Sequence, residues 1–403
     1  MQFGQGEVFE ACWEAVKRHF YDKGLHGVDW EGARGRYEGR AVAAQPGPEL
    51  HAVLAEMLGE LKASHVSIMA RSVYEGMMSE LQGKAHLTFG ILLEESMPGR
   101  FFLRAAFEGG PAGRAGLLFG DRIVAVEGEE AAASAWIVDA GYDPGGGKPR
   151  LLFFRAEEGR ALRLVVQRTP AASSRFETTL EPALMCGVDA AGNSARVVER
   201  DGLRIGTAHL WYCQRGAPAA IRAALQAPLA ACDALILDLR GRGGHAAVAR
   251  EIVNLFRPSR RRIRGGQGEL EPAVWSKPVV FLIDERTRSA KEMLAHELRA
   301  ARIGPLVGTR TEGAVLGAGF FPLPDGSVLE LPIADVVMEG VRLEGIGVAP
   351  DHEVDLIVPY AAGFDSAFER ALDVAVAETR AARRRAREFI RAATPPTPAA
   401  TRG

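Results

Sequence analysis

Residues 234–245 read ALILDLRGRGGH, an apolar run that stops at a cluster of glycines. A second apolar run, PVVFLID at residues 278–284, leads through ERTRS into the helical pattern AKEMLAHELRAAR. Apolar runs that alternate with helices are typical of parallel strands covered by helices on both faces of the sheet. These stretches therefore predict an α/β core with a mostly parallel sheet.

The ends of these two runs are natural places for a functional site, because sites in open parallel sheets form beyond the carboxyl ends of the strands. The glycines after the first run let backbone N–H groups turn inward and bind an anion. Ser289 follows the second run at the start of a helix, where free N–H groups favour negative charge. Each feature alone also fits a simple turn or a helix cap.

The rest of the chain divides by pattern around this core. Apolar residues recur at helical spacing between positions 50 and 61, so the N-terminal part is expected to be mainly helical. Short strand-like runs separated by Gly and Pro then predict a compact β module. The expected segments are an N-terminal helical segment at 1–84, the β module at 85–172, the α/β core at 173–361, a C-terminal helix at 362–393 and a disordered tail at 394–403.

The composition excludes several classes of partner. The 403 residues include 49 basic and 51 acidic side chains, so the formal net charge of −2 gives no reason to expect nucleic acid. No window holds the roughly 18 apolar residues of a membrane-spanning helix, and the N-terminus lacks a signal-peptide pattern. The sequence as it stands therefore predicts a cytoplasmic protein without membrane insertion, or a periplasmic or secreted one if a signal peptide has been trimmed. The four cysteines form no CxxC pair, which argues against a zinc site.

Taken in order, several segments resemble the tail-specific (C-terminal processing) and tricorn-core superfamily of serine proteases. They are VFEACWEAVKRHFYDKGLHGVDWEGARGRY near the N-terminus, LDLRGRGGH at the glycine turn, FLIDERTRSAKEM around Ser289, and GTRTEGAVLG and LEGIGVAPDHEVD downstream. The resemblance runs over nearly all of residues 7–360. It implies a ClpP/crotonase-like core, an N-terminal helical segment and an inserted PDZ-like β module.

The resemblance also implies a catalytic set. Tail-specific members pair the nucleophile with a Lys in a GxxTxGKG motif, but Ala314 stands at that position here. Tricorn-like members use Ser, His and Glu, with a second Ser beside the His, and Ser64, His65 and Glu344 match this pattern. We therefore expect Ser289 to attack, His65 to act as base and then as acid, and Glu344 to orient the system through Ser64. Their separation in the chain is no objection, because catalytic triads are recognised by geometry.

The remaining parts of the expected site are less sharply defined. The backbone N–H of Ala290, together with that of Gly243 or Gly244, is expected to bind the oxyanion.

Two nearby bases compete with His65 for the proton of Ser289. Lys291 lies two positions on along the same helix and points to another side, and His296 lies about 10 Å along the helix axis.

The β module resembles a PDZ domain through the segment GPAGRAGLLFGDRIVAVEG. Such a domain binds a peptide by adding a strand to its sheet edge and captures the terminal carboxylate on loop amides. Thr88, Phe89, Gly90 and Ile91 fit the position of that carboxylate loop. The implied role is peptide binding or gating, and the alternative is a structural module whose groove is covered by the chain itself.

These features lead to one functional hypothesis and one alternative. The leading hypothesis is a serine endopeptidase or C-terminal processing peptidase that cleaves peptides or unfolded polypeptides through an acyl-enzyme, without metal or other cofactor. The alternative is a catalytically inactive peptide-binding or small-ligand-binding protein on the same fold. Peptides or unfolded proteins are the expected partners, and tricorn-like relatives suggest a homo-oligomer by analogy.

Overall fold

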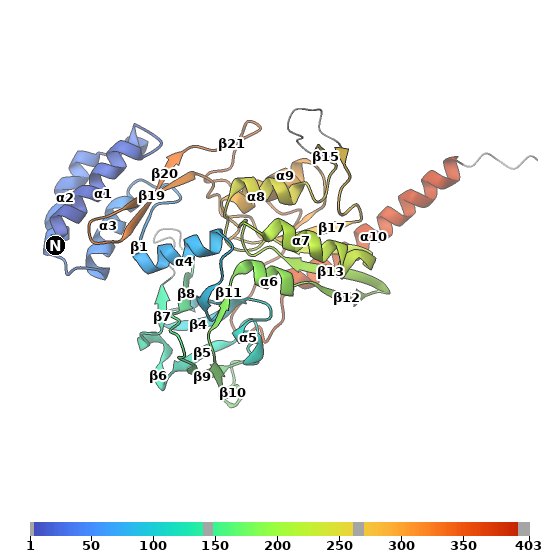
Figure 1. Cartoon of the computed structure of the whole chain (residues 1–403), viewed down its shortest axis with the longest axis horizontal. Coiled ribbons are helices and arrows are strands. Elements are labelled where there is room, and N and C mark those ends of the chain that lie inside the picture. The colour runs from blue at the N-terminus through green and yellow to red at the C-terminus, as the bar shows by residue number, and fades with distance from the viewer. Residues whose placement is uncertain (1–3, 140–147, 261–269, 394–403) are drawn as a thin grey trace, which may run out of the picture.

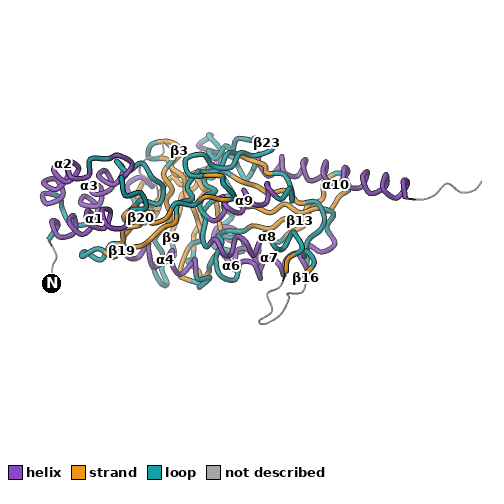
Figure 2. Tube along the Cα trace, turned by 90° about the horizontal axis from the view of Figure 1, so that it is seen from above, coloured by secondary structure: helices purple, strands orange, loops and turns teal. Residues whose placement is uncertain are grey.

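The computed structural model describes residues 4–139, 148–260 and 270–393 (Figure 1). The expectation for the tail at 394–403 lies outside these residues. In Figures 1 and 2, N-terminal helices stand at one end of the molecule and the C-terminal helix projects from the other, with the sheets between them.

The N-terminal helices are tied to a distant part of the chain. Three of them, α1 (Gln5–His19), α2 (Trp30–Ala43) and α3 (Pro48–Gly59), share one apolar core. Leu329 and Leu331 of strand β20 (Val328–Ala334) belong to the same core. Strand β1 (Ser67–Met69) pairs antiparallel with β20, whose other neighbour is β19 (Gly317–Pro322). Burial of the helices' apolar faces thus fixes the segment around residue 65 against the C-terminal part of the chain.

The β module is one antiparallel sheet in the order β10-β9-β5-β4-β3-β8-β7, and β6 pairs with β5 at its side. Its apolar core continues to Leu180 in β10, so the module extends past the predicted boundary at residue 172. Pairing of β2 with β11 joins the entry to the exit of the module. The strands are β2 (His86–Thr88), β3 (Ile91–Met97), β4 (Arg100–Ala106), β5 (Arg122–Val126), β6 (Glu129–Glu130), β7 (Ile137–Asp139), β8 (Arg150–Phe154), β9 (Leu162–Gln167), β10 (Arg175–Leu180) and β11 (Ala183–Met185).

The core sheet confirms the predicted α/β class and its mostly parallel order. Strand β12 (Arg196–Arg200) is antiparallel to β13 (Leu203–His209). The next four neighbours run parallel, in the order β14 (Ala234–Asp238), β17 (Val279–Ile283), β18 (Leu306–Gly308) and β23 (His352–Glu353). The two apolar runs that predicted the core are therefore the central strands β14 and β17.

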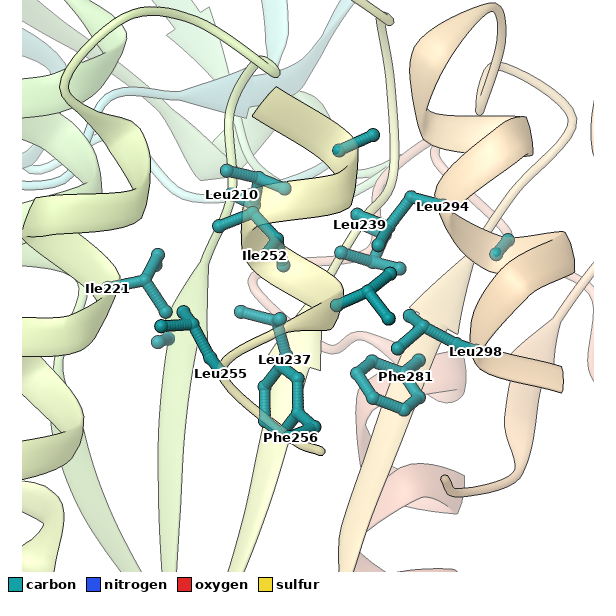
Figure 3. Packing of buried hydrophobic residues seen from close by; sticks show 14 of the residues in the cluster. Leu210, Ile221, Leu237, Leu239, Ile252, Leu255, Phe256, Phe281, Leu294 and Leu298 are labelled. Carbon is teal, nitrogen blue, oxygen red and sulfur yellow. The ribbon is translucent and has the colours of Figure 1, made fainter. Parts of the chain in front are cut away.

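Helices cover both faces of this sheet, which explains why its central strands are apolar throughout. On one face, α8 (Ala246–Val253) and α9 (Ala290–Ala300) share a core with the sheet and with α7 (Ala217–Gln226). Figure 3 shows Ile252 of α8 and Leu294 of α9 facing the strands. The first part of α10 (Ser366–Ala393) covers the other face. Among the described residues, no helix combines the length and the apolar character needed to cross a membrane.

The remaining elements are short and connect these layers. They are α4 (Arg71–Leu81), α5 (Pro111–Arg114), α6 (Gly187–Asn193), the 3-10 turns η1 (Leu25–Gly27), η2 (Ala131–Ala133), η3 (Ala172–Ser174) and η4 (Leu229–Ala231), and the strands β15 (Ser259–Arg260), β16 (Leu270–Glu271), β21 (Val337–Met338) and β22 (Val341–Arg342).

Candidate active site

Ser289 is held in a strained turn between β17 and α9. Its backbone has φ 54° and ψ −129°, a region that costs a non-glycine residue about 1–3 kcal/mol. Its N–H donates to the carbonyl of Ala314 at 2.7 Å, and its carbonyl accepts from the N–H of Glu292 at 2.9 Å. The hydroxyl makes no capping bond within the described part of the chain, although Ser289 is the first residue before α9. The structure therefore disfavours the simple helix-cap interpretation, and a strained strand-to-helix turn is a known way to expose a nucleophile.

His65 belongs to a hydrogen-bonded chain of three side chains. Oγ of Ser64 lies 2.9 Å from Nδ1 of His65 and donates to Oε2 of Glu344 at 3.0 Å. A hydroxyl has one proton to donate, and the carboxylate can only accept, so Oγ must accept a hydrogen bond from Nδ1–H. This arrangement selects the imidazole tautomer that carries its proton on Nδ1 and leaves the lone pair of Nε2 available as a base.

Glu344 is fixed in place by backbone groups from two parts of the chain. Oε1 accepts from the N–H of Ser64 at 3.1 Å, and Oε2 also accepts from the N–H of Val315 at 2.9 Å. These bonds place the carboxylate where it holds the Ser64 hydroxyl in one orientation. The structure thus brings together Ser64, His65 and Glu344, which the sequence predicted as a set.

The imidazole of His65 is only 8% exposed. Burial lowers its pKa well below the ordinary value of 6.5, and the positive charge of Arg288 lowers it further. Because the neutral form is the one that accepts a proton, this environment keeps His65 ready to act as a base at neutral pH.

Gly243 is the glycine that lies against Ser289. A Cβ added to Gly243 would sit 2.5 Å from Cβ of Ser289 and 3.1 Å from the backbone nitrogen of Ala290. Gly244 faces away from them, since its added Cβ would meet the carbonyl oxygen of Cys213 at 2.4 Å. The carbonyl of Gly243 accepts from the N–H of Cys213 at 2.8 Å, which fixes the turn. Of the two predicted oxyanion glycines, the geometry favours Gly243.

A cavity of about 720 Å³ connects these residues with the β module. His65, Gly243 and Ser289 line it, and Thr88 and Ile91 line it from the module. Much of the remaining wall is apolar: Met77, Leu87, Phe107, Phe153, Met293, Leu316 and Phe320. An extended chain with apolar side chains suits such a space.

The rival bases are placed elsewhere. Nζ of Lys291 is buried and donates to the carbonyl of Arg240 at 2.8 Å. Burial is the main cause that lowers its pKa, to about 8. Lys291 and His296 are both absent from the described residues that line the cavity. Ala314 is buried at the position where the tail-specific motif has its Lys.

Sequence reasoning missed two buried carboxylates that support the site. Glu292 accepts from the N–H groups of Gly313 and Ala314 at 2.7 and 2.6 Å, and so positions the loop that receives the amide of Ser289. Asp284 accepts from the N–H of Gly241 at 3.0 Å and thereby joins the turn after β14 to the turn after β17. Glu292 lies three residues after Ser289, one helical turn on, and this spacing was the available signal.

Arg104 links the β module to the core through a buried ion pair. Its guanidinium lies 2.6 Å from Oδ2 of Asp284 and 3.1 Å from Oε2 of Glu94. Burial alone would raise the pKa of Asp284, but the charge of Arg104 and the bond from Gly241 lower it overall. No local pattern in the sequence identifies Arg104, because its partner is 180 positions away.

The predicted peptide-binding loop is only partly accessible. Phe89 is buried in the core of the module. The N–H of Gly90 already donates to Oγ1 of Thr88 at 2.9 Å. Thr88, Gly90 and Ile91 do line the cavity, but Leu93, Glu94 and Glu95 of β3 pair with β8. The chain's own backbone thus occupies the edge of β3 at these three residues, and peptide binding at Thr88–Ile91 stays a prediction.

Two segments of the chain match known protein families. Residues 204–354 match the model of peptidase family S41, and residues 6–59 match the tricorn protease C1 domain. The chain thus contains a peptidase S41 domain and a tricorn C1 domain. The two matched segments include the core strands and the N-terminal helices, in the order that the sequence resemblance implied.

Two similar proteins extend the match over most of the chain. Tricorn protease homolog 1 of Streptomyces coelicolor is 28% identical over 391 residues, which cover 92% of this chain and 35% of that protein. Carboxyl-terminal-processing peptidase 2, chloroplastic, of Arabidopsis thaliana is 24% identical over 379 residues, covering 87% of this chain and 69% of that protein. The chain thus spans about a third of the length of the tricorn homologue.

Solved structures share the fold. The photosystem II D1 C-terminal processing protease superposes with a TM-score of 0.53 at 21% identity, covering 90% of this chain and 97% of that one. The tricorn protease superposes with a TM-score of 0.54 at 17% identity, covering 93% and 37%. The chain therefore shares its fold with these two proteases over most of its length.

Proposed function

We propose that this chain is a serine peptidase that cleaves peptides or unfolded polypeptides through an acyl-enzyme. The observation that carries the proposal is that His65, oriented by Ser64 and Glu344, lines the same cavity as the strained Ser289. A nucleophile, a base and a group that orients the base are the parts that acyl transfer needs.

In the first step, Nε2 of His65 takes the proton of the Ser289 hydroxyl while Oγ attacks the scissile carbonyl. The N–H groups of Gly243 and Ala290 receive the developing oxyanion, and the start of α9 adds favourable charge there. Loss of one such donor typically slows catalysis by about 10²–10³-fold. The imidazolium then donates its proton to the departing amine, which leaves an ester on Ser289.

In the second step, His65 takes a proton from a water molecule, and the water attacks the ester. The proton then returns to Oγ of Ser289, and the cleaved acid leaves. Throughout, Glu344 stabilises the imidazolium indirectly, because Ser64 stands between the two groups. This relay replaces the direct carboxylate–imidazole contact of many serine hydrolases.

The substrate class follows from the cavity and from the relatives. The cavity is long enough to reach from Ser289 to the β module, and much of its wall is apolar, so an extended polypeptide suits it better than a small polar molecule. Similarity to a carboxyl-terminal-processing peptidase favours processing near a carboxyl terminus. We propose that the β module contributes to this cleavage by peptide binding or gating, and the homo-oligomer is likewise a prediction.

Labelling with a fluorophosphonate tests the proposal directly. We expect wild type to be labelled and Ser289→Ala not to be labelled, with loss of cleavage of an unstructured test protein in the same variant. Ser174→Ala is a suitable control, because Ser174 lies in a surface turn of the β module. If wild type neither reacts nor cleaves while it still binds the test protein, the alternative of an inactive peptide-binding protein holds instead.

A further inference from the structure

Strand β3 has neighbours on both of its edges. It pairs antiparallel with β4 on one side, and Leu93, Glu94 and Glu95 pair with Leu152, Leu151 and Arg150 of β8 on the other. Peptides that bind by strand addition need an edge whose N–H and C=O groups are free. Strand β8 already takes up that edge at Leu93–Glu95, which begins two residues after the predicted carboxylate loop.

The side chains of β8 alternate between two environments. Leu152 and Phe154 are buried in the core of the β module. Leu151 and Phe153 point the other way, as alternate residues of a strand must. Phe153 lines the 720 Å³ cavity that contains Ser289, and Phe154 at the end of the strand also reaches its wall, whereas Leu151 lines an adjoining cavity of about 480 Å³. Strand β8 thus forms a wall between the module and the core.

The start of β8 is anchored beside the nucleophile turn. The guanidinium of Arg286 donates to the carbonyl of Pro149. Nε of Arg150 donates to Oε2 of Glu95 across the strand pair at 2.7 Å. Nζ of Lys148 lies 3.8 Å from Oε1 of Glu312, the same oxygen that Arg288 approaches at 3.8 Å. The strand is therefore held from the module and from the residues that flank Ser289.

We propose that β8 is the resident strand of the β module: it occupies in cis the edge that a peptide would take, and it uses Phe153 to shape the substrate cavity. The inference rests on the proposed peptidase function and makes Phe153 a specificity-determining residue. The module then acts as a wall of the cavity and does not capture peptide ends at this edge.

A disulfide across the strand pair tests whether β8 stays in place during cleavage. Glu95 and Arg150 are directly opposed, and opposed antiparallel residues have Cα atoms about 4.5–5.5 Å apart, within the range that a disulfide spans. The four native cysteines are buried, so oxidation of Glu95→Cys/Arg150→Cys is selective. We expect the bond to form and the oxidised protein to cleave within about twofold of the reduced protein.

Two results of this experiment would overturn the inference. Failure to crosslink would mean that β8 does not lie on β3, and this readout requires no activity. Loss of cleavage on oxidation, restored by a reductant, would mean that β8 must leave the edge to admit substrate.

The second experiment compares Phe153→Ala with Leu151→Ala, which removes an apolar side chain from the same face of the same strand. We expect Phe153→Ala to change the ratio of kcat/KM between peptides with bulky and small side chains by about tenfold. Leu151→Ala should leave that ratio unchanged. Equal ratios for wild type and Phe153→Ala would refute the specificity role, whereas absence of cleavage and of fluorophosphonate labelling in wild type would refute the proposed function itself.

Discussion

Oγ of Ser64 donates a hydrogen bond to Oε2 of Glu344 at 3.0 Å, across 280 positions of the chain. The same oxygen atom of Ser64 lies 2.9 Å from Nδ1 of His65. The hydroxyl of Ser64 thus links the carboxylate to the imidazole. Because this hydroxyl donates to Glu344, Nδ1 of His65 must carry the proton and Nε2 is the base.

The position of Ser64 between His65 and Glu344 predicts what its removal does to catalysis. Ser64→Ala should lower kcat by about 10²-fold, because His65 loses the partner that selects its tautomer. Cleavage of a fluorogenic peptide under saturating substrate measures this. Ser67→Ala is the matched control, since Ser67 lies in the same segment and bonds Glu330 instead. A kcat within twofold of wild type for Ser64→Ala would show that Glu344 does not act through Ser64.

The contact between Gly243 and Ser289 predicts that the turn tolerates no side chain. Gly243→Ala would place a methyl group 2.5 Å from Cβ of Ser289, so the turn must shift and the oxyanion donors move. We expect fluorophosphonate labelling to fall by about 10²-fold or more.

Gly241→Ala separates backbone strain from this steric clash. Gly241 has φ 80°, so alanine is strained there by about 1–2 kcal/mol, but its added Cβ meets nothing within 4 Å. We expect a lower Tm with labelling largely retained. Efficient labelling of Gly243→Ala would exclude Gly243 as an oxyanion donor.

The lowered pKa of His65 predicts the acid limb of activity. Its folded pKa lies below the ordinary value of 6.5, so the neutral base persists below that pH and kcat/KM should begin to fall only at more acidic pH. Arg288→Gln removes one of the two causes of the lowering, and we expect the midpoint of the limb to rise. A pH profile of kcat/KM for both proteins measures the shift, and an unchanged midpoint would contradict the role of the Arg288 charge.

The same depressed pKa has a consequence for stability. Well above pH 6.5, His65 is neutral in both folded and unfolded chains and contributes no pH dependence. Below 6.5 the unfolded chain binds more protons at this position, so the free energy of unfolding should fall with falling pH down to the folded pKa. Urea titrations of wild type and His65→Gln between pH 7 and 5 compare the slopes, and the variant should show the smaller one.

Lys291 provides a test of the rival mechanism. Lys291→Met removes the ammonium but keeps an apolar chain of similar length in its buried site, and we expect most of the cleavage to remain. The folded pKa of about 8 lies below the ordinary 10.5, so wild type should gain stability as pH rises through this window, and the variant should lack that gain. Complete loss of cleavage in a folded Lys291→Met would restore a Ser–Lys mechanism.

Much of this site was visible in local sequence. The runs at β14 and β17 are apolar throughout because both faces of the strands are covered, and the turn after each run is marked by Gly241 or by Ser289. Ala314 by itself removed the Lys of the tail-specific motif. The match of Ser64, His65 and Glu344 came from the resemblance. In the structure the hydroxyl of Ser64 joins the other two side chains.

Other features depended on the tertiary structure. The sequence could not choose between Gly243 and Gly244, because both lie in one turn and only packing against Ser289 and Cys213 distinguishes them. It identified neither Arg104 nor Asp284 as a pair across the module and the core.

The β module shows most clearly what the sequence alone could not predict. The sequence by itself predicted a module of short strands at residues 85–172, because apolar content and spacing are local properties. Only the tertiary structure decided that β8 pairs with β3 and closes the edge expected to bind peptide. The reason is that edge pairing uses backbone N–H and C=O groups, which every residue except proline carries alike, so the partner is selected by the packing of the whole module.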